Sequence, residues 1–228
     1  MKECSVCKKK IGLFDKKISL KENEFCHTKC YSKTKEGQLY SCLIKAKAYT
    51  IDKEIDKAMK EVEKGLAIKE NVLDLLCLKS SLLGMKGNVK ESLEWGIKAL
   101  ARFEQLYGKG FIKKQLEKTR NKEISQEWLM ENDFLVDQYG DLLRALILDY
   151  MTLKQYENAI PFIKEEIFIY PTFIRGFDDI AKCYFQLKNY FEAEKYYKKS
   201  LELEGCPKDF IEKRAKEFFS KIKKNGVI

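Results

Sequence analysis

The sequence LKQYENA at residues 153–159 and its near copy LKNYFEA at residues 187–193 decide the fold of this 228-residue chain. The two heptapeptides are 34 residues apart, and Tyr150 and Tyr184 keep the same offset. A fixed period of about 20 to 50 residues is typical of a stacked repeat. Each period is long enough for two short antiparallel helices, which can bury their apolar faces only by stacking on neighbouring repeats.

The same offset recurs upstream, where Ile55 precedes Val89 and Gly65 precedes Ala99 by 34 residues. Small residues at matching positions are expected where helices touch closely. We therefore predict four repeats, at residues 39–72, 73–106, 140–173 and 174–207.

Residues 107–139 lack this pattern, although their length is close to one repeat. Two interpretations stay open: a degenerate repeat, or an insertion that shapes a partner surface. Residues 208–224 place apolar side chains three and four positions apart, which predicts an amphipathic helix. We expect this helix to cap the open face of the last repeat.

The apolar and aromatic positions of the last two predicted repeats resemble the tetratricopeptide (TPR) family. The matching residues are Leu143, Leu146, Tyr150, Ala159, Ile163 and Pro171, followed by Phe177, Ile180, Ala181, Tyr184, Ala193 and Tyr197. The resemblance implies a mainly α protein, a right-handed TPR-like α-solenoid of antiparallel helix pairs.

Such a solenoid has a concave groove that is lined by the first helix of each repeat. Helical phase places the following residues in the groove: Arg144, Leu148, Met151, Arg175, Asp178, Lys182 and Phe185. This lining predicts a partner protein that binds as an extended peptide or a helix. The family's clamp of Lys and Asn residues for a C-terminal carboxylate has no match at these positions.

Residues 1–38 carry a metal-binding pattern of two close pairs. Cys4 and Cys7 form a Cys-x-x-Cys turn, and the second pair lies in the segment Cys26-His27-Thr28-Lys29-Cys30. Zinc takes four nitrogen or sulfur ligands in a tetrahedron, and this spacing suits it. For the second pair we prefer His27 with Cys30, because it repeats the spacing of the first pair; Cys26 with Cys30 is the alternative.

This segment is similar to a small bacterial zinc-ribbon family and to the knuckle of LIM-type fingers. The likeness is carried by Cys4–Cys7, Lys10–Phe14 and Phe25–Tyr31. It implies structural Zn²⁺ and contact with macromolecules. A module this short cannot bury a useful core, so we expect the metal to hold a small β-rich knuckle together.

The chain has a net charge of +9, and its first 38 residues contain ten lysines against five acidic residues. This excess gives an alternative function, nucleic-acid binding with the repeats used for dimerisation or regulation. The lysines concerned are Lys8, Lys9, Lys10, Lys16 and Lys17.

No catalytic motif is present in the sequence, and the single histidine, His27, is already a candidate zinc ligand. No apolar run approaches the length of a membrane span, and the N-terminus lacks the apolar core of a signal peptide. We therefore predict a non-enzymatic, cytoplasmic adaptor protein that carries a zinc knuckle ahead of a TPR-like body.

Overall fold

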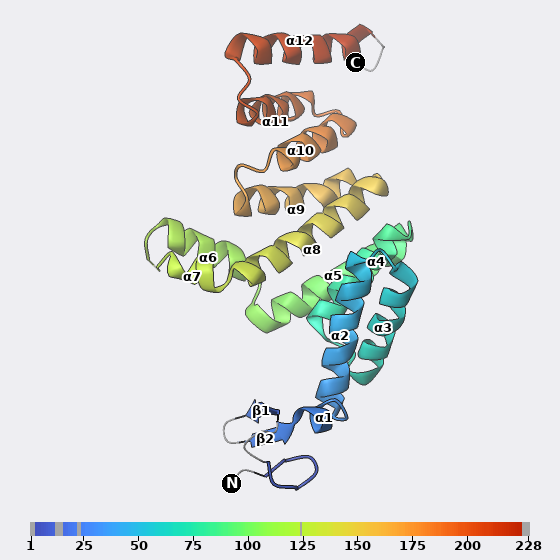
Figure 1. Ribbon diagram of the computed structural model, residues 1–228. Helices are drawn as coiled ribbons and strands as arrows, with labels where there is room; N and C mark the ends of the chain where they lie inside the picture. Colours follow the sequence, from blue (N-terminus) through green and yellow to red (C-terminus); the bar gives the residue numbers. More distant parts are fainter. Residues whose placement is uncertain (1–2, 12–15, 22–23, 124, 225–228) are drawn as a thin grey trace. The chain divides into compact units, whose positions relative to one another are not determined.

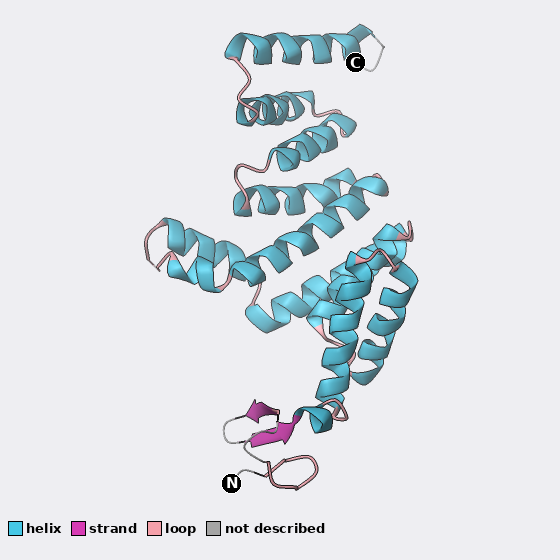
Figure 2. Ribbon diagram, viewed as in Figure 1, coloured by secondary structure: helices cyan, strands magenta, loops and turns pink. Residues whose placement is uncertain are grey.

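The computed structural model describes residues 3–11, 16–21, 24–123 and 125–224. The chain is mainly helical, with one small sheet near the N-terminus (Figure 2). It divides into two compact units, Met1–Asn88 and Val89–Ile228, which are described separately below. Among the described residues, no helix has the length and apolarity needed to cross a bilayer.

The first unit begins with the predicted small β-containing module. Strands β1 (Lys17–Lys21) and β2 (Glu24–His27) pair antiparallel, with Ile18 opposite Cys26, and the short helix α1 (Thr28–Tyr31) follows. The amide of Ser5 donates to the carbonyl of Phe25 at 2.9 Å, which ties the preceding loop to β2. The module has a very small core, made of Cys4, Ile11 and Cys26.

The rest of the first unit is helical: α2 (Lys35–Ile51), α3 (Ile55–Ile68) and α4 (Leu73–Met85). Thr34 caps α2, because its hydroxyl accepts from the amide of Gly37 at 3.0 Å. Helix α3 packs against both α2 and α4.

The described residues of the second unit fold into helices α5 to α12, which Figure 1 labels. They are α5 (Val89–Tyr107), α6 (Phe111–Arg120), α7 (Glu127–Glu131), α8 (Asp133–Thr152), α9 (Tyr156–Ile169), α10 (Ile174–Gln186), α11 (Tyr190–Leu203) and α12 (Lys208–Lys224). Helix α5 packs against α8, and from α8 to α12 each helix packs against the next. Helix α12 buries Ile211 and Ala215.

The 34-residue period is visible in the backbone of the turns. The residue in the middle of each turn has a left-handed conformation, with φ of 59° at Lys53, 80° at Gly87, 58° at Lys154 and 61° at Lys188. The next amide donates to a carbonyl five residues back, as Gln155 does to Tyr150 at 2.8 Å. This hydrogen bond closes a helix C-terminus and reverses the chain.

The period also appears in the aromatic packing between paired helices. Tyr150 of α8 stacks on Phe162 of α9 with ring centroids 5.6 Å apart, and Tyr184 of α10 stacks on Tyr196 of α11 at 5.7 Å. Both interplanar angles are 13°. These rings therefore join the two helices of each pair, in agreement with a packing role for the regularly spaced tyrosines.

Helices α6 and α7 lie between α5 and α8 in the sequence, although α5 and α8 pack directly on each other. Helix α6 contacts α9, while α7 contacts α8. Aromatic contacts hold the segment in place: Tyr107 packs on Phe111 at 5.8 Å, and Phe111 meets the edge of Trp128 at 6.1 Å.

Candidate metal centre and interaction surface

Four predicted ligand residues converge in the N-terminal module. Cys4 and Cys7 come from the first loop, His27 ends β2, and Cys30 lies in α1. Their ligand atoms all lie within 4.8 Å of one another. The His27 Nδ1 atom is 3.5 Å from Cys7 Sγ and 3.8 Å from Cys30 Sγ.

The Cys-x-x-Cys turn is shaped by its own backbone. The amide of Lys8 donates to the carbonyl of Cys4 at 2.8 Å, and the amide of Cys7 donates to the Cys4 sulfur at 3.5 Å. Burial opposes ionisation of Cys4, but backbone amides of Cys7, His27 and Val6 outweigh it and lower the pKa of this thiol to about 6. The turn thus stabilises a thiolate, which is the form that binds metals.

The geometry and chemistry of this donor set fit zinc. Tetrahedral zinc with typical Zn–S and Zn–N bonds separates a sulfur from a nitrogen ligand by about 3.5 Å. Burial and then the neighbouring Cys7 and Cys4 raise the pKa of Cys30 to about 11. Three neighbouring thiols do not all ionise to thiolates unless a cation offsets their negative charge. Zn²⁺ bound here would supply that positive charge.

Cys26, the alternative third ligand, lies elsewhere in the module. Its side chain is fully buried in the small core with Cys4 and Ile11. It is not a member of the four-residue cluster. The structure therefore brings His27, rather than Cys26, to the other three ligand residues.

The five lysines of the nucleic-acid hypothesis are all exposed. The Lys17 ammonium lies 5.8 Å from the centre of the Phe25 ring. Nucleic-acid binding through these side chains stays a prediction.

The predicted groove residues fall on two helices of the second unit. On α8, Leu148 is 49% exposed and Met151 is half-buried. On α10, Arg175 and Lys182 are exposed. Asp178 is half-buried, as is Phe185, whose ring meets Tyr190 edge-on at 5.6 Å.

Arg144 differs from its predicted neighbours because its guanidinium is already bound. Its Nε donates to Glu166 Oε1 at 2.7 Å, and its Nη1 donates to Asp179 Oδ2 at 2.6 Å. Glu166 is 2% exposed and Asp179 is 5% exposed. One arginine of α8 therefore holds buried carboxylates from α9 and α10.

Neither Asp179 nor Glu166 is among the site residues predicted from the sequence. A signal for Glu166 existed, because Ala159, Ile163 and Glu166 share one face of α9. A carboxylate on the buried stripe of a helix needs a partner. Asp149 is a second such case, and its carboxylate accepts from the Ser92 hydroxyl at 2.6 Å.

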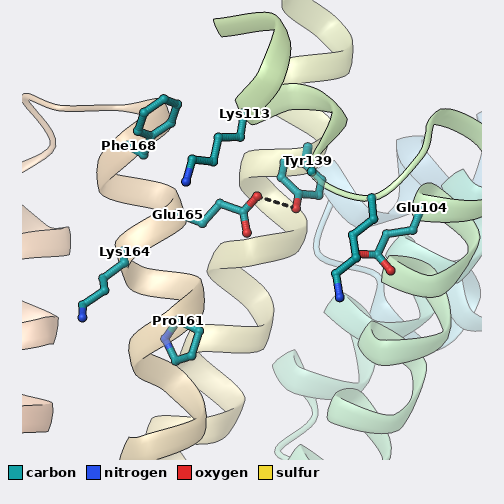
Figure 3. A pocket seen from close by; sticks show the side chains of 9 residues that line it. Glu104, Lys113, Tyr139, Pro161, Lys164, Glu165 and Phe168 are labelled. Atoms are coloured by element: carbon teal, nitrogen blue, oxygen red, sulfur yellow. Dashed lines mark hydrogen bonds between the residues drawn. The ribbon is translucent and has the colours of Figure 1, made fainter. Parts of the chain in front are cut away.

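A cavity of about 360 Å³ lies between the α5–α6 segment and α9 (Figure 3). Tyr139 of α8 donates to Glu165 of α9 at 2.9 Å on its wall. Lys109, Lys113 and Lys164 line it together with Glu104 and Glu165, so its charges are mixed. Phe168 and Pro161, which stands within α9 without ending the helix, add apolar surface.

Comparison with known proteins defines the class of fold. A sequence profile of the tetratricopeptide repeat matches residues 175–205, which correspond to α10 and α11. The chain thus contains a tetratricopeptide repeat, and its architecture is a mainly helical TPR-like solenoid with a small N-terminal sheet. No curated protein matches the sequence.

Solved structures of MamA share this fold. One crystal structure of MamA is 20% identical, with a TM-score of 0.55, and the match covers 78% of this chain and 86% of that one. MamA residues 41 to the end from Desulfovibrio magneticus RS-1 are 12% identical, with a TM-score of 0.56 and coverage of 82% and 94%.

Proposed function

We propose that the protein is a non-enzymatic adaptor that binds a segment of another protein on the groove face of α8 and α10. The observation that carries the proposal is the exposure of matching side chains on the first helices of two consecutive pairs. Leu148 offers apolar surface, while Arg175 and Lys182 offer charge. Exposed apolar surface rimmed by charge is typical of a protein-binding site.

The repeat body also supports this function over catalysis. The single histidine lies in the cysteine cluster, so no imidazole remains for acid–base chemistry in the helical body. The buried carboxylates Glu166 and Asp179 are held by Arg144, which suits a structural role.

A peptide selection on the intact chain tests the adaptor function. Peptides enriched from a displayed random library are measured against the wild type and against the double variant Arg175→Glu/Lys182→Glu. We expect the variant to lose binding. The matched control, Lys199→Glu/Lys216→Glu, makes the same charge change at exposed positions of α11 and α12 and is expected to bind normally. Equal binding by both variants, with unchanged circular dichroism, rejects the groove.

We further infer that Cys4, Cys7, His27 and Cys30 hold one structural Zn²⁺. A closed four-ligand site leaves no position for a reacting water, so its contribution is to fold the knuckle. Metal analysis tests this assignment. We expect one zinc per chain in the wild type and in Cys26→Ala, and loss of zinc in Cys7→Ser and His27→Ala. Loss from Cys26→Ala and retention in His27→Ala reverses the choice of third ligand.

We also assign residues 107–139 as an insertion between repeats. The direct packing of α5 on α8 supports this assignment, since a degenerate repeat would separate the helices that flank it. We propose that the other helices belong to the repeats 39–72, 73–106, 140–173 and 174–207 and to the capping helix 208–224.

A further inference from the structure

A second cavity lies on the groove side of α8, beside the Arg144 network. Its volume is about 330 Å³, which is in the range of sites for small ligands or single side chains. The start of α8, the end of α9 and the loop before α10 enclose it. Its lining residues are Asp137, Gly140, Asp141, Arg144, Glu166, Tyr170 and Phe173.

The charges of this cavity do not cancel. Arg144 is engaged by Glu166 and Asp179, and Arg175 lies close enough to Glu166 to act on its charge. Lys182 Nζ also lies 3.5 Å from Asp179 Oδ1, so Glu166 and Asp179 both have cationic partners. Asp137 and Asp141 have no such partner, because no lysine or arginine among the described residues forms an ion pair with either carboxylate. Partial burial, and then repulsion from Asp137, raises the pKa of Asp141.

Two aromatic residues, Tyr170 and Phe173, line the cavity beside these carboxylates. The Tyr170 hydroxyl donates to Asp137 Oδ1 at 3.1 Å, which fixes this carboxylate at the wall. The Phe173 ring centre is 4.9 Å from the Arg144 guanidinium carbon, so the ring already stacks on one cation while remaining 37% exposed. Gly140 makes room for Tyr170, because a Cβ there would lie 2.5 Å from the tyrosine oxygen.

We propose that this cavity binds a lysine or arginine side chain of the partner protein. The proposal rests on the proposed function, and it specifies that the bound segment is basic at the position that meets α8. Carboxylates supply charged hydrogen bonds to the cation, and the rings of Tyr170 and Phe173 supply cation–π contact.

A metal ion fits the cavity less well than an organic cation. Within the described residues, the only cluster with the convergence that a metal needs is the one formed by Cys4, Cys7, His27 and Cys30. The carboxylates of the cavity are instead spread around its wall. A guanidinium or ammonium group on an apolar stem can contact both the carboxylates and the rings.

A titration with defined peptides tests the cavity without knowledge of the natural partner. The ¹⁵N-labelled intact chain is titrated with blocked pentapeptides that carry arginine, lysine, citrulline or glutamate between glycines. We expect the arginine and lysine peptides to shift the amide signals of Gly140, Tyr170 and Phe173. The neutral citrulline peptide, which matches arginine in shape, is expected to bind about tenfold more weakly.

Three variants complete the test. Asp137→Asn and Asp141→Asn keep side-chain size and are each expected to weaken the arginine peptide about tenfold. Asp209→Asn, which makes the same change at an exposed position of α12 outside the groove and the cavity, serves as the control and is expected to bind normally. Tyr170→Phe keeps the ring but loses the bond to Asp137, so we expect an intermediate affinity. Equal shifts by arginine and citrulline peptides, or unchanged binding in both Asp137→Asn and Asp141→Asn, overturn the proposal.

Failure of the cavity is distinguishable from failure of the adaptor function. Library peptides that bind the groove without basic residues, and without sensitivity to Asp137→Asn, would uphold the adaptor and reject the basic side chain. The reverse result, cation binding in the cavity with no groove-dependent library peptide, would uphold the cavity and reject the adaptor.

Discussion

Replacing Arg144 by methionine should destabilise the second unit more than any exposed charge change. The substitution preserves an unbranched side chain of similar length but removes the hydrogen bonds to Glu166 and Asp179. Both carboxylates are then buried without their cation, at 2% and 5% exposure. Breaking a buried ion pair in this way costs about 3–5 kcal/mol. For a chain of this length, that loss corresponds to a fall in Tm of about 6–20 °C.

The pH dependence of this loss has a definite sign. Burial already raises the pKa of Glu166, with Arg144 opposing the shift, so removal of Arg144 raises it further. A carboxyl group whose folded-state pKa is raised favours the folded state below its unfolded pKa and loses that stabilisation as the pH rises through the folded pKa. The deficit of Arg144→Met relative to the wild type should therefore grow from acidic to neutral pH.

Urea unfolding of both proteins, followed by circular dichroism at pH 5 and pH 7, measures the deficit. Because repeat proteins can unfold in steps, hydrogen exchange of α8, α9 and α10 should accompany it. The triple variant Arg144→Met/Glu166→Gln/Asp179→Asn removes the uncompensated charge and should recover most of the stability. A loss below about 1 kcal/mol at pH 7, or no recovery in the triple variant, would refute the assignment of a buried ion-pair network.

Three further perturbations have expected outcomes. Asp149→Asn should raise the free energy of unfolding by about 1 kcal/mol at neutral pH, because burial raises the pKa of Asp149 although its carboxylate accepts a hydrogen bond from the Ser92 hydroxyl. This gain in stability should shrink in acid, where Asp149 is protonated. Thermal unfolding at two pH values measures it, and no gain at neutral pH contradicts the prediction. Lys188→Gly should raise the free energy of unfolding by about 1 kcal/mol, because Lys188 has a left-handed φ of 61°. The control Lys199→Gly, within α11, should lower it by about as much. Equal effects of the two substitutions in denaturant unfolding would reject backbone strain at Lys188. A zinc chelator should abolish the protection of backbone amides from hydrogen exchange in β1, β2 and α1, and should leave α8 to α11 protected. Loss of amide protection in both regions would contradict a knuckle that unfolds independently of the repeats.

The TPR-like fold of α8 to α11 could be predicted from the 34-residue period because this period is a local property. A turn with one left-handed residue, a closing hydrogen bond and one stacked ring pair recur at equivalent positions, and each depends only on nearby sequence. Buried charge could not be predicted in the same way. Arg144 has the correct phase for the groove, yet its guanidinium is taken up by Glu166 and Asp179 from two other helices.

The choice between Cys26 and His27 shows a second limit, which spacing cannot overcome. Successive side chains of a strand point to opposite faces, so neighbours in β2 cannot both reach one point. Cys26 pairs with Ile18 across the sheet and enters the core, which leaves His27 at the strand end beside Cys30. The repeated spacing favours His27, but the physical reason for the exclusion of Cys26 is the position of β2, which the spacing does not contain.

The departures from the repeat contribute to both of the cavities described above. Helix α8 has 20 residues, against 13 in the equivalent helix α10, because it begins at Asp133, ahead of the repeat that was predicted to start at residue 140. This extension supplies Tyr139 to the mixed-charge cavity and Asp137 to the acidic one. The insertion that precedes it supplies Lys109 and Lys113. A regular repeat would present the groove without either cavity. We therefore infer that selectivity for a partner arises within residues 107–139, where the insertion leads into the extended start of α8.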